Sequence, residues 1–186
     1  MLIRIPGRRR LLLGLGTAAV LGAALVGTAG PGSAASPAAP SAADSTSSDS
    51  VPEAIRVPPG NRLIAQFAAK GVQVYQCTGG AWRFLEPIAA LGEPSPAVIH
   101  FRGPSWESIR DGSLVEAATV ASSPVPGAIP QLLLKATTTR GTGIFGDVTF
   151  VQRLDTAGGL APTTTCKDGQ TQGVPYTADY LFFARG

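Results

Sequence analysis

Polar and apolar residues alternate over several short segments of the chain, a spacing that is typical of half-buried β-strands. The segment Val72–Cys77 has this character and is rich in β-branched and aromatic side chains. Ala81–Leu85 follows across Thr78-Gly79-Gly80, and this arrangement predicts a hairpin. Further strands are predicted at residues 97–102, 114–120, 132–138, 144–154 and 179–183.

Two of these segments carry more specific expectations. The apolar run at residues 132–134 fits a buried helical turn as well as a strand, because so short a run does not fix its own period. In the segment 144–154, alternation places Val148, Phe150 and Leu154 on one side of the strand.

One segment has the spacing of a helix. Residues 58–61 supply a break and a possible N-cap at Asn61, and Gly71 is placed for a C-terminal cap. The apolar residues of one helical face would be Leu63, Ile64, Phe67 and Ala68. The pattern therefore predicts an N-terminal helix that precedes the first strand.

The many short strands, separated by turns rich in Gly, Pro, Ser and Asp, favour a mainly β fold. We expect a single-domain β-sandwich or barrel over residues 51–186, with one N-terminal helix and long loops. The sixteen prolines and twenty-three glycines of the chain fit such loops. A segment of this length is sufficient for one hydrophobic core.

The first 35 residues have the pattern of an export signal. Four arginines precede an uncharged run from Leu11 to Val26, and small residues around Ala35 follow as a cleavage site. The alternative is a retained transmembrane anchor, because the run approaches the length of a bilayer span. Arg8-Arg9 loosely fits the twin-arginine export route. We expect the protein to be secreted or associated with the cell envelope.

Residues 36–50 consist mainly of Pro, Ala, Ser, Thr and Asp. Such a segment buries too little apolar surface to offset the entropy of ordering it, so we predict a disordered linker between the signal and the domain.

The net charge of +3 comes from the signal. Four of the fifteen basic residues and none of the twelve acidic residues precede the expected cleavage site, which leaves eleven against twelve. The remaining arginines are scattered along the sequence. We therefore expect no nucleic-acid partner and, after signal cleavage, no membrane partner. The sequence does not indicate the oligomeric state.

The chain has two cysteines, Cys77 and Cys166. In an exported protein this pair is expected to form a disulfide, which would enclose most of the domain. The alternative is a pair of buried free thiols.

The chemistry-bearing residues gather around His100, the only histidine. Residues 98–113 contain an imidazole, an indole, carboxylates and hydroxyls near turns, where functional groups often collect. A catalytic set would use His100 as base, with Asp111 or Glu107 as partner and Ser113 as nucleophile. The alternative is a hydrogen-bonded core histidine and a carboxylate that caps a turn.

The ligand-binding candidates are His100, Trp106, Asp111 and Tyr176. Trp106 and Tyr176 belong, with Trp82, Tyr75 and Tyr180, to a set of aromatic residues that could line a sugar or peptide site, although aromatic residues on strands more often fill the core.

We expect no metal site and no cofactor. A single histidine and a disulfide-bonded cysteine pair cannot supply the three or four nitrogen and sulfur ligands of a zinc site. The stretch from Gly141 to Gly146 matches the spelling of a dinucleotide-binding loop, but it precedes a strand and does not follow one.

The chain resembles the secreted family catalogued as domain of unknown function 3455. The resemblance rests on five segments in matching order: GVQVYQC, HFRGPSWESIRDGS, IPQLLLKA, VTFVQRLDTAGGLAP and VPYTADYLFF. It covers nearly all of residues 58–183 and implies a single exported domain without an established activity. The family typically has Trp at the position of Gln131, so the ligand preference of this member is expected to differ if that position lines a site.

Three functional hypotheses follow. The first is an exported domain that binds a ligand or a cell-envelope component without catalysis. The second is a small secreted hydrolase that uses His100 with Asp111 or Glu107. The third is a structural or host-interaction protein without a small-molecule site.

Overall fold

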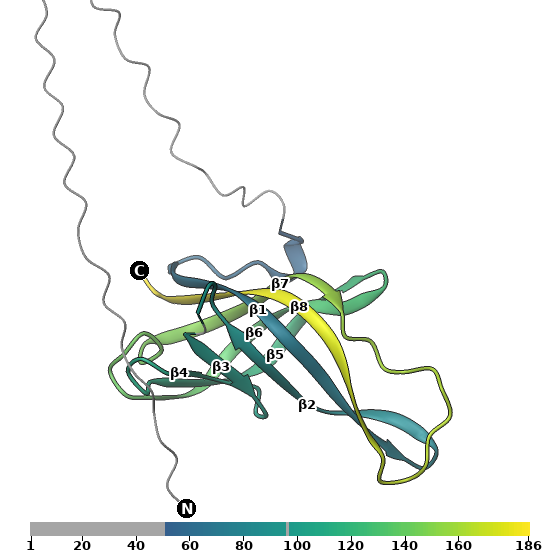
Figure 1. Cartoon of the computed structure of the whole chain (residues 1–186). Helices are drawn as coiled ribbons and strands as arrows, with labels where there is room; N and C mark the ends of the chain where they lie inside the picture. The colour runs from purple at the N-terminus through teal and green to yellow at the C-terminus, as the bar shows by residue number, and fades with distance from the viewer. Residues whose placement is uncertain (1–50, 96) are drawn as a thin grey trace, which may run out of the picture. The chain divides into compact units, whose positions relative to one another are not determined.

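The computed structural model describes residues 51–95 and 97–186, which form eight antiparallel strands and one short 3-10 helix (Figure 1). The elements in chain order are η2 (Glu53–Ile55), β1 (Asn61–Thr78), β2 (Ala81–Leu91), β3 (Val98–Phe101), β4 (Ser105–Ser108), β5 (Leu114–Val125), β6 (Ala128–Arg140), β7 (Val148–Gly158) and β8 (Thr171–Arg185). The prediction of a mainly β domain is confirmed.

Each strand pairs with the next strand along the chain, and β1 also pairs with β8. The hydrogen-bonded strand order therefore runs from β1 to β8 and returns to β1. Because the connections are successive hairpins, alternate turns lie at opposite ends. The β3–β4 and β5–β6 turns share one end, whereas the β4–β5 and β6–β7 connections share the other.

The predicted N-terminal helix is wrong, because residues 61–71 form the first half of β1. A register shift between Leu63 and Ala65 interrupts the alternation of this strand. Leu63 is consequently exposed, while Ile64, Ala65 and Phe67 all pack against the core. Such a bulge mimics helical spacing, since it brings two successive residues toward one side. Because β1 pairs with β8 along almost its whole length, this segment is a strand and not a helix.

The prediction that Val148, Phe150 and Leu154 lie on one side of β7 is wrong, because the register of this strand shifts between Val148 and Phe150. Val148 packs in the large interior cluster with Val151, whereas Phe150 and Leu154 pack in a smaller cluster. Residues 144–147 precede the strand. The run at residues 132–134 lies inside β6, which excludes the helical turn.

The structure has two apolar clusters. The larger one contains inward-facing side chains from most strands, with Trp106, Tyr180 and Phe182 among its largest members. The smaller one forms where Ile55 of η2 packs with Leu133 and Leu154. A buried Gln152 donates its amide N–H to the Ile55 carbonyl at 2.6 Å and so fixes this segment to the strands.

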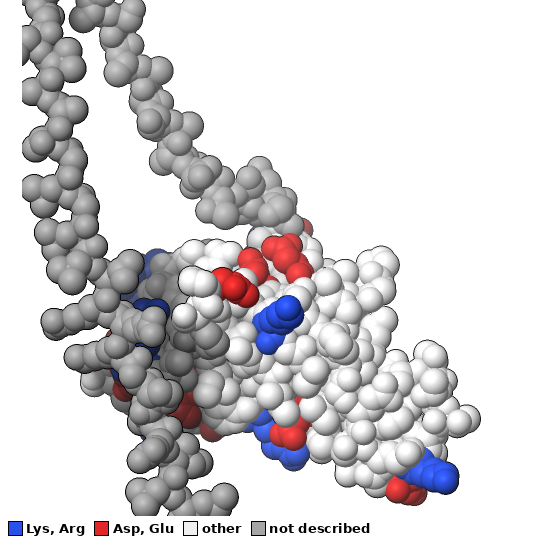
Figure 2. All heavy atoms as spheres, in the orientation of Figure 1, with Lys and Arg blue, Asp and Glu red and all other residues white. Residues whose placement is uncertain are grey.

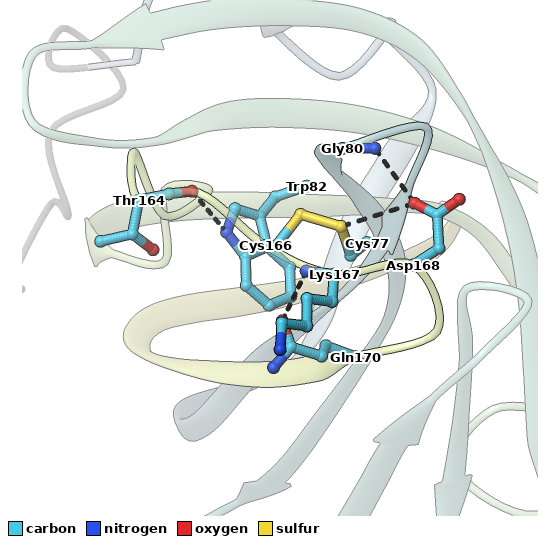
Figure 3. The surroundings of a disulfide bond; sticks show 8 residues. All are labelled: Cys77, Gly80, Trp82, Thr164, Cys166, Lys167, Asp168 and Gln170. Atoms are coloured by element: carbon cyan, nitrogen blue, oxygen red, sulfur yellow. Dashed lines mark hydrogen bonds between the residues drawn. A yellow bond between two sulfur atoms is a disulfide. The ribbon is translucent and has the colours of Figure 1, made fainter.

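The disulfide between Cys77 and Cys166 is confirmed (Figure 3). It joins the end of β1 to the connection between β7 and β8, and neighbouring hydrogen bonds reinforce the junction. The Trp82 indole donates to the Thr164 carbonyl at 3.0 Å, and the Gly80 N–H donates to Asp168 at 3.0 Å. The long β7–β8 connection is therefore held against the β1–β2 hairpin.

The predicted signal and linker, residues 1–35 and 36–50, lie outside the described residues. Within the part of the chain that the structure describes, no helix is long and apolar enough to cross a membrane.

Candidate functional site

A pocket of about 420 Å³ lies between the inward-facing side chains of the strands. Its volume falls in the range of about 300–1,000 Å³ that is usual for small-molecule sites. The β3–β4 turn, at Gly103-Pro104, and the start of β6 contribute to its wall, which places it toward one end of the strands. The lining residues are Gln73, Tyr75, Phe84, Leu85, Pro87, His100, Arg102, Gly103, Pro104, Trp106, Thr119, Ile129, Pro130, Leu132, Leu134, Arg153 and Tyr180.

Strand pairing explains why residues far apart in sequence meet in this pocket. His100 of β3 lies opposite Trp106 of β4 across the shortest hairpin. Arg153 of β7 lies opposite Tyr180 of β8. Opposed residues in an antiparallel pair point to the same face of the sheet, so both pairs project into the interior.

His100 is held rigidly in the pocket wall. Its Nδ1 lies 2.8 Å from the Ser105 carbonyl, which requires a proton on Nδ1 and leaves Nε2 as the acceptor in the neutral ring. The ring stacks on Trp106 with a centroid distance of 4.4 Å and an angle of 3°. Burial lowers the pKa of His100 to about 4, against the opposing effect of the Ser105 hydrogen bond. The imidazole is therefore neutral at physiological pH.

Two buried donors in the pocket wall lack a partner. The indole Nε1–H of Trp106 and the amide Nε2–H of Gln73 have no hydrogen-bond acceptor among the described residues. Trp106 is 1% exposed and Gln73 is 2% exposed, so bulk water does not compensate them. An unsatisfied buried polar group costs about 1–3 kcal/mol, and such groups are rare in folded proteins.

Arg153 contributes a positive charge to the same pocket wall. Its Nε and Nη2 donate to the Pro130 carbonyl at 3.1 and 2.8 Å. Its guanidinium exerts a pKa-lowering influence on His100 and on Tyr75, Tyr176 and Tyr180. The guanidinium of Arg153 therefore lies near His100 and these three tyrosines. Neither ion pair seen among the described residues involves Arg153.

The tyrosines of the site are held as neutral hydroxyls. The Tyr176 and Tyr180 hydroxyl oxygens are 3.3 Å apart, and Tyr75 donates to the Gly159 carbonyl at 2.6 Å. Burial raises the pKa of all three phenols above the usual value of 10, so none ionises near neutral pH. Tyr176, a ligand-binding candidate from the sequence, is not among the residues that line the pocket but contacts the lining residue Tyr180.

The remaining predicted site residues lie at the opposite end of the strands. Asp111 accepts the N–H groups of Ser113 at 2.9 Å and Ile144 at 3.2 Å, and thus joins the β4–β5 turn to the β6–β7 loop. Hydrogen bonds from Ser113 and Ile144 lower the pKa of Asp111 to about 2. Ser113 is buried and its Oγ accepts the Phe145 N–H at 3.1 Å.

Glu107 forms an ion pair with Arg140 at 2.6 Å on the exposed surface. The structure thus brings together His100 and Trp106 but gives Asp111, Ser113 and Glu107 other partners. No hydrogen bond joins His100 to a carboxylate or a hydroxyl side chain within the described ranges.

The described residues contain no group of three or more His, Cys, Asp or Glu side chains that could hold a metal ion. Charged side chains lie scattered on the face shown in Figure 2, and most of that face carries neither sign of charge.

Three important residues of the pocket were not among the candidates from sequence: Gln73, Arg153 and Pro130. Alternation within Val72–Cys77 places Gln73 on the same side as Tyr75, and this was the available signal. A glutamine that alternates with valines is usually solvent-exposed, however. Gln131, which replaces the family's usual Trp, follows Pro130 and is not among the lining residues.

Comparison with curated proteins and with solved structures found no match. The model of one protein family matches residues 92–184, which cover β3 to β8 and include His100, Trp106, Arg153 and Tyr180. The chain therefore belongs to the family described as Protein of unknown function (DUF3455).

Proposed function

We propose that this protein is an exported domain that binds a small organic molecule in the barrel pocket without catalysing a reaction on it. The observation that carries the proposal is the pair of unpartnered buried donors, Trp106 Nε1–H and Gln73 Nε2–H, beside an open pocket. A protein that tolerates this cost without a ligand gains the lost hydrogen bonds when a suitable acceptor binds.

The fold supports this use of the pocket. The proposal treats the closed ring of strands as a rigid barrel, and barrels of eight strands are wide enough to hold one small ligand. The wall is largely apolar, with Leu132, Leu134 and Ile129 among its side chains, and carries only a few polar groups. This combination is typical of sites that bury most of a ligand and orient it by a few hydrogen bonds.

The surroundings of His100 favour binding over hydrolysis. A general base requires a pKa near the working pH and a group that orients it. His100 has a pKa of about 4 and bonds to a backbone carbonyl, while Asp111 and Ser113 bond to each other elsewhere. We therefore place the hydrolase hypothesis second.

The proposed location outside the cytoplasm is supported by the disulfide, because such bonds persist mainly in oxidising compartments. The signal-like N-terminus is in agreement with this location. Retention in the cell envelope remains part of the proposal.

Fluorescence of Trp106 tests the binding function. The chain has two tryptophans, so the variant Trp82→Phe leaves Trp106 as the only indole. The neutral apolar probe N-phenyl-1-naphthylamine should bind saturably, with energy transfer from Trp106 and an increase in the melting temperature. Absence of saturable binding by this probe and by its anionic analogue, described below, would contradict the proposed function.

A further inference from the structure

The pocket contains one positive charge that no acidic side chain balances. Arg153 and Arg102 are the two cations of the wall, and the lining includes no Asp or Glu. Arg102 is compensated, because its Nε lies 3.1 Å from Glu86 at the surface. Arg153 donates to the Pro130 carbonyl and also interacts with the Tyr180 hydroxyl, which satisfies part of its fork of donors but not its charge.

The other polar groups around Arg153 are those that an anion would accept. Trp106 and Gln73 each offer an N–H without a protein acceptor, and Tyr180 carries a neutral hydroxyl. The neutral His100 adds no competing positive charge and presents its Nε2 lone pair as an acceptor. Residues from β1, β4, β7 and β8 thus contribute polar groups to the pocket wall, whereas most of the other lining residues are apolar.

We propose that the pocket takes a small amphipathic molecule whose head is an oxyanion, a carboxylate or a sulfonate, bound by the Arg153 guanidinium. The N–H groups of Trp106 and Gln73 complete the head site, and the apolar body lies against Leu132, Leu134 and Ile129. Charge-assisted hydrogen bonds of a guanidinium to an oxyanion are among the strongest in proteins, and burial strengthens them further. This inference rests on the proposed function and specifies its ligand class.

A matched pair of probes separates the two claims. N-phenyl-1-naphthylamine and 1-anilinonaphthalene-8-sulfonate share the same aromatic body and differ in one sulfonate. The purified protein should bind the sulfonate at least about tenfold more tightly than the neutral probe, which corresponds to one charge-assisted interaction. Competition with 1-naphthylacetate and its uncharged analogue 1-naphthylacetamide then tests whether a carboxylate is accepted as the head.

The variant Arg153→Gln should lower the affinity for the anionic probe by about tenfold and leave the neutral probe unchanged. The matched control is Arg140→Gln, which removes an arginine that pairs with Glu107 outside the pocket lining and should change neither affinity strongly. If Arg153→Gln does not fold, Arg153→Lys replaces it as a variant that retains the charge. The ratio of the affinities of the unaltered protein for the two probes tests the claim without any variant.

Equal binding of the two probes would overturn the anionic head and leave the binding function standing. Tighter binding of the sulfonate that survives in folded Arg153→Gln would also overturn it, because the selectivity would then come from another group. Failure of both probes would overturn the proposed function and this inference together.

Discussion

At the scale of single residues, two buried glutamines have opposite situations. Gln73 and Gln152 are 2% and 3% exposed, but only Gln152 has a partner for its amide N–H, the Ile55 carbonyl at 2.6 Å. A buried polar group stabilises a fold only when its hydrogen bonds are made. The two residues therefore allow a comparison of a glutamine whose amide is hydrogen-bonded within the protein with one that we propose binds a ligand.

The replacement Gln73→Met should stabilise the protein by about 1 kcal/mol, because it removes an uncompensated amide from the interior. The same replacement should weaken binding of the anionic probe. Its matched control, Gln152→Met, should destabilise the protein by about 1–3 kcal/mol, because the Ile55 carbonyl loses its donor. Urea unfolding measures the free energy of unfolding of the unaltered protein and of both variants. A loss of stability in Gln73→Met equal to that in Gln152→Met would contradict this distinction.

His100 should make the stability of the protein depend on pH. Burial lowers its pKa to about 4 in the folded state, against the usual 6.5 of an exposed histidine, so the unfolded chain binds the proton more readily. Stability should therefore decrease as the pH falls from about 6.5 to about 4, by up to roughly 3 kcal/mol. Asp111 contributes below this window, because its lowered pKa makes stability fall only below about pH 4.

Urea unfolding between pH 7.5 and 4.5 measures this dependence. His100→Gln, which retains a donor and an acceptor but does not titrate in this range, is the control and should show a flatter profile. An equally steep profile in the variant would assign the effect to other groups.

At the scale of the elements, Gly71 shows why a segment with helical spacing in its sequence forms a strand. The predicted helix would use this residue as its cap, but Gly71 lies within β1 opposite Ala89 of β2. A Cβ atom at this position would collide with the Ile88 carbonyl oxygen and with Ala89 of the neighbouring strand. The close approach of the two backbones thus requires a glycine.

The variant Gly71→Ala should therefore destabilise the protein by about 3 kcal/mol, because the β1–β2 backbones must separate. Gly173→Ala in β8 is the matched control, since its Cβ would meet Val72 at an ordinary 3.4 Å. Circular dichroism melts compare the two variants. Equal melting temperatures of the two variants would show that β1 and β2 can separate without loss of stability, which would contradict this prediction.

The sequence predicts the strands where β-branched and aromatic residues flank a glycine turn, as in Val72–Cys77 and its hairpin partner, even though a register shift falls at Val74/Tyr75. It fails at the bulges near Leu63 and Val148, since a bulge shifts the alternation by one residue without a distinctive residue type. The four-residue strand β4 was also missed, because Gly103-Pro104 and the following polar residues resemble a loop.

The site could be predicted only where its parts are neighbours in sequence. His100 and Trp106 meet across one short hairpin, so their proximity in the sequence was sufficient. Arg153 and Gln73 join them through pairings between strands that are distant in the sequence, which a single sequence does not specify. Asp111 and Ser113 are near His100 in sequence, but the next turn of the meander carries them to the other end of the strands.

At the scale of the whole domain, the disulfide closes a loop across a sequence separation of 89 residues. A cross-link of this span restricts the unfolded chain and stabilises the fold by about 4–5 kcal/mol in the chain-entropy account. It also holds the connection that carries Gly159, whose carbonyl accepts the Tyr75 hydroxyl in the pocket wall.

The double variant Cys77→Ser/Cys166→Ser should lower the free energy of unfolding by about 2–5 kcal/mol, as is usual when a native disulfide is removed. Chemical denaturation of the variant against the oxidised protein measures the difference. Addition of a reductant to the unaltered protein should reproduce the loss. Equal stability of the reduced and oxidised proteins would show that the hydrogen bonds around Asp168 and Thr164 suffice to hold the loop.

The central claim is that the unpartnered donors of the pocket wall bind a ligand. The most direct measurement is a nitrogen–proton correlation spectrum of the labelled protein during titration with 1-anilinonaphthalene-8-sulfonate. The two indole N–H signals act as probe and control, because Trp106 lacks an acceptor whereas Trp82 donates to Thr164. We predict a large, saturable shift of the Trp106 signal and of the Gln73 amide, with Trp82 little changed. A Trp106 signal that remains fixed while the probe binds would contradict the account.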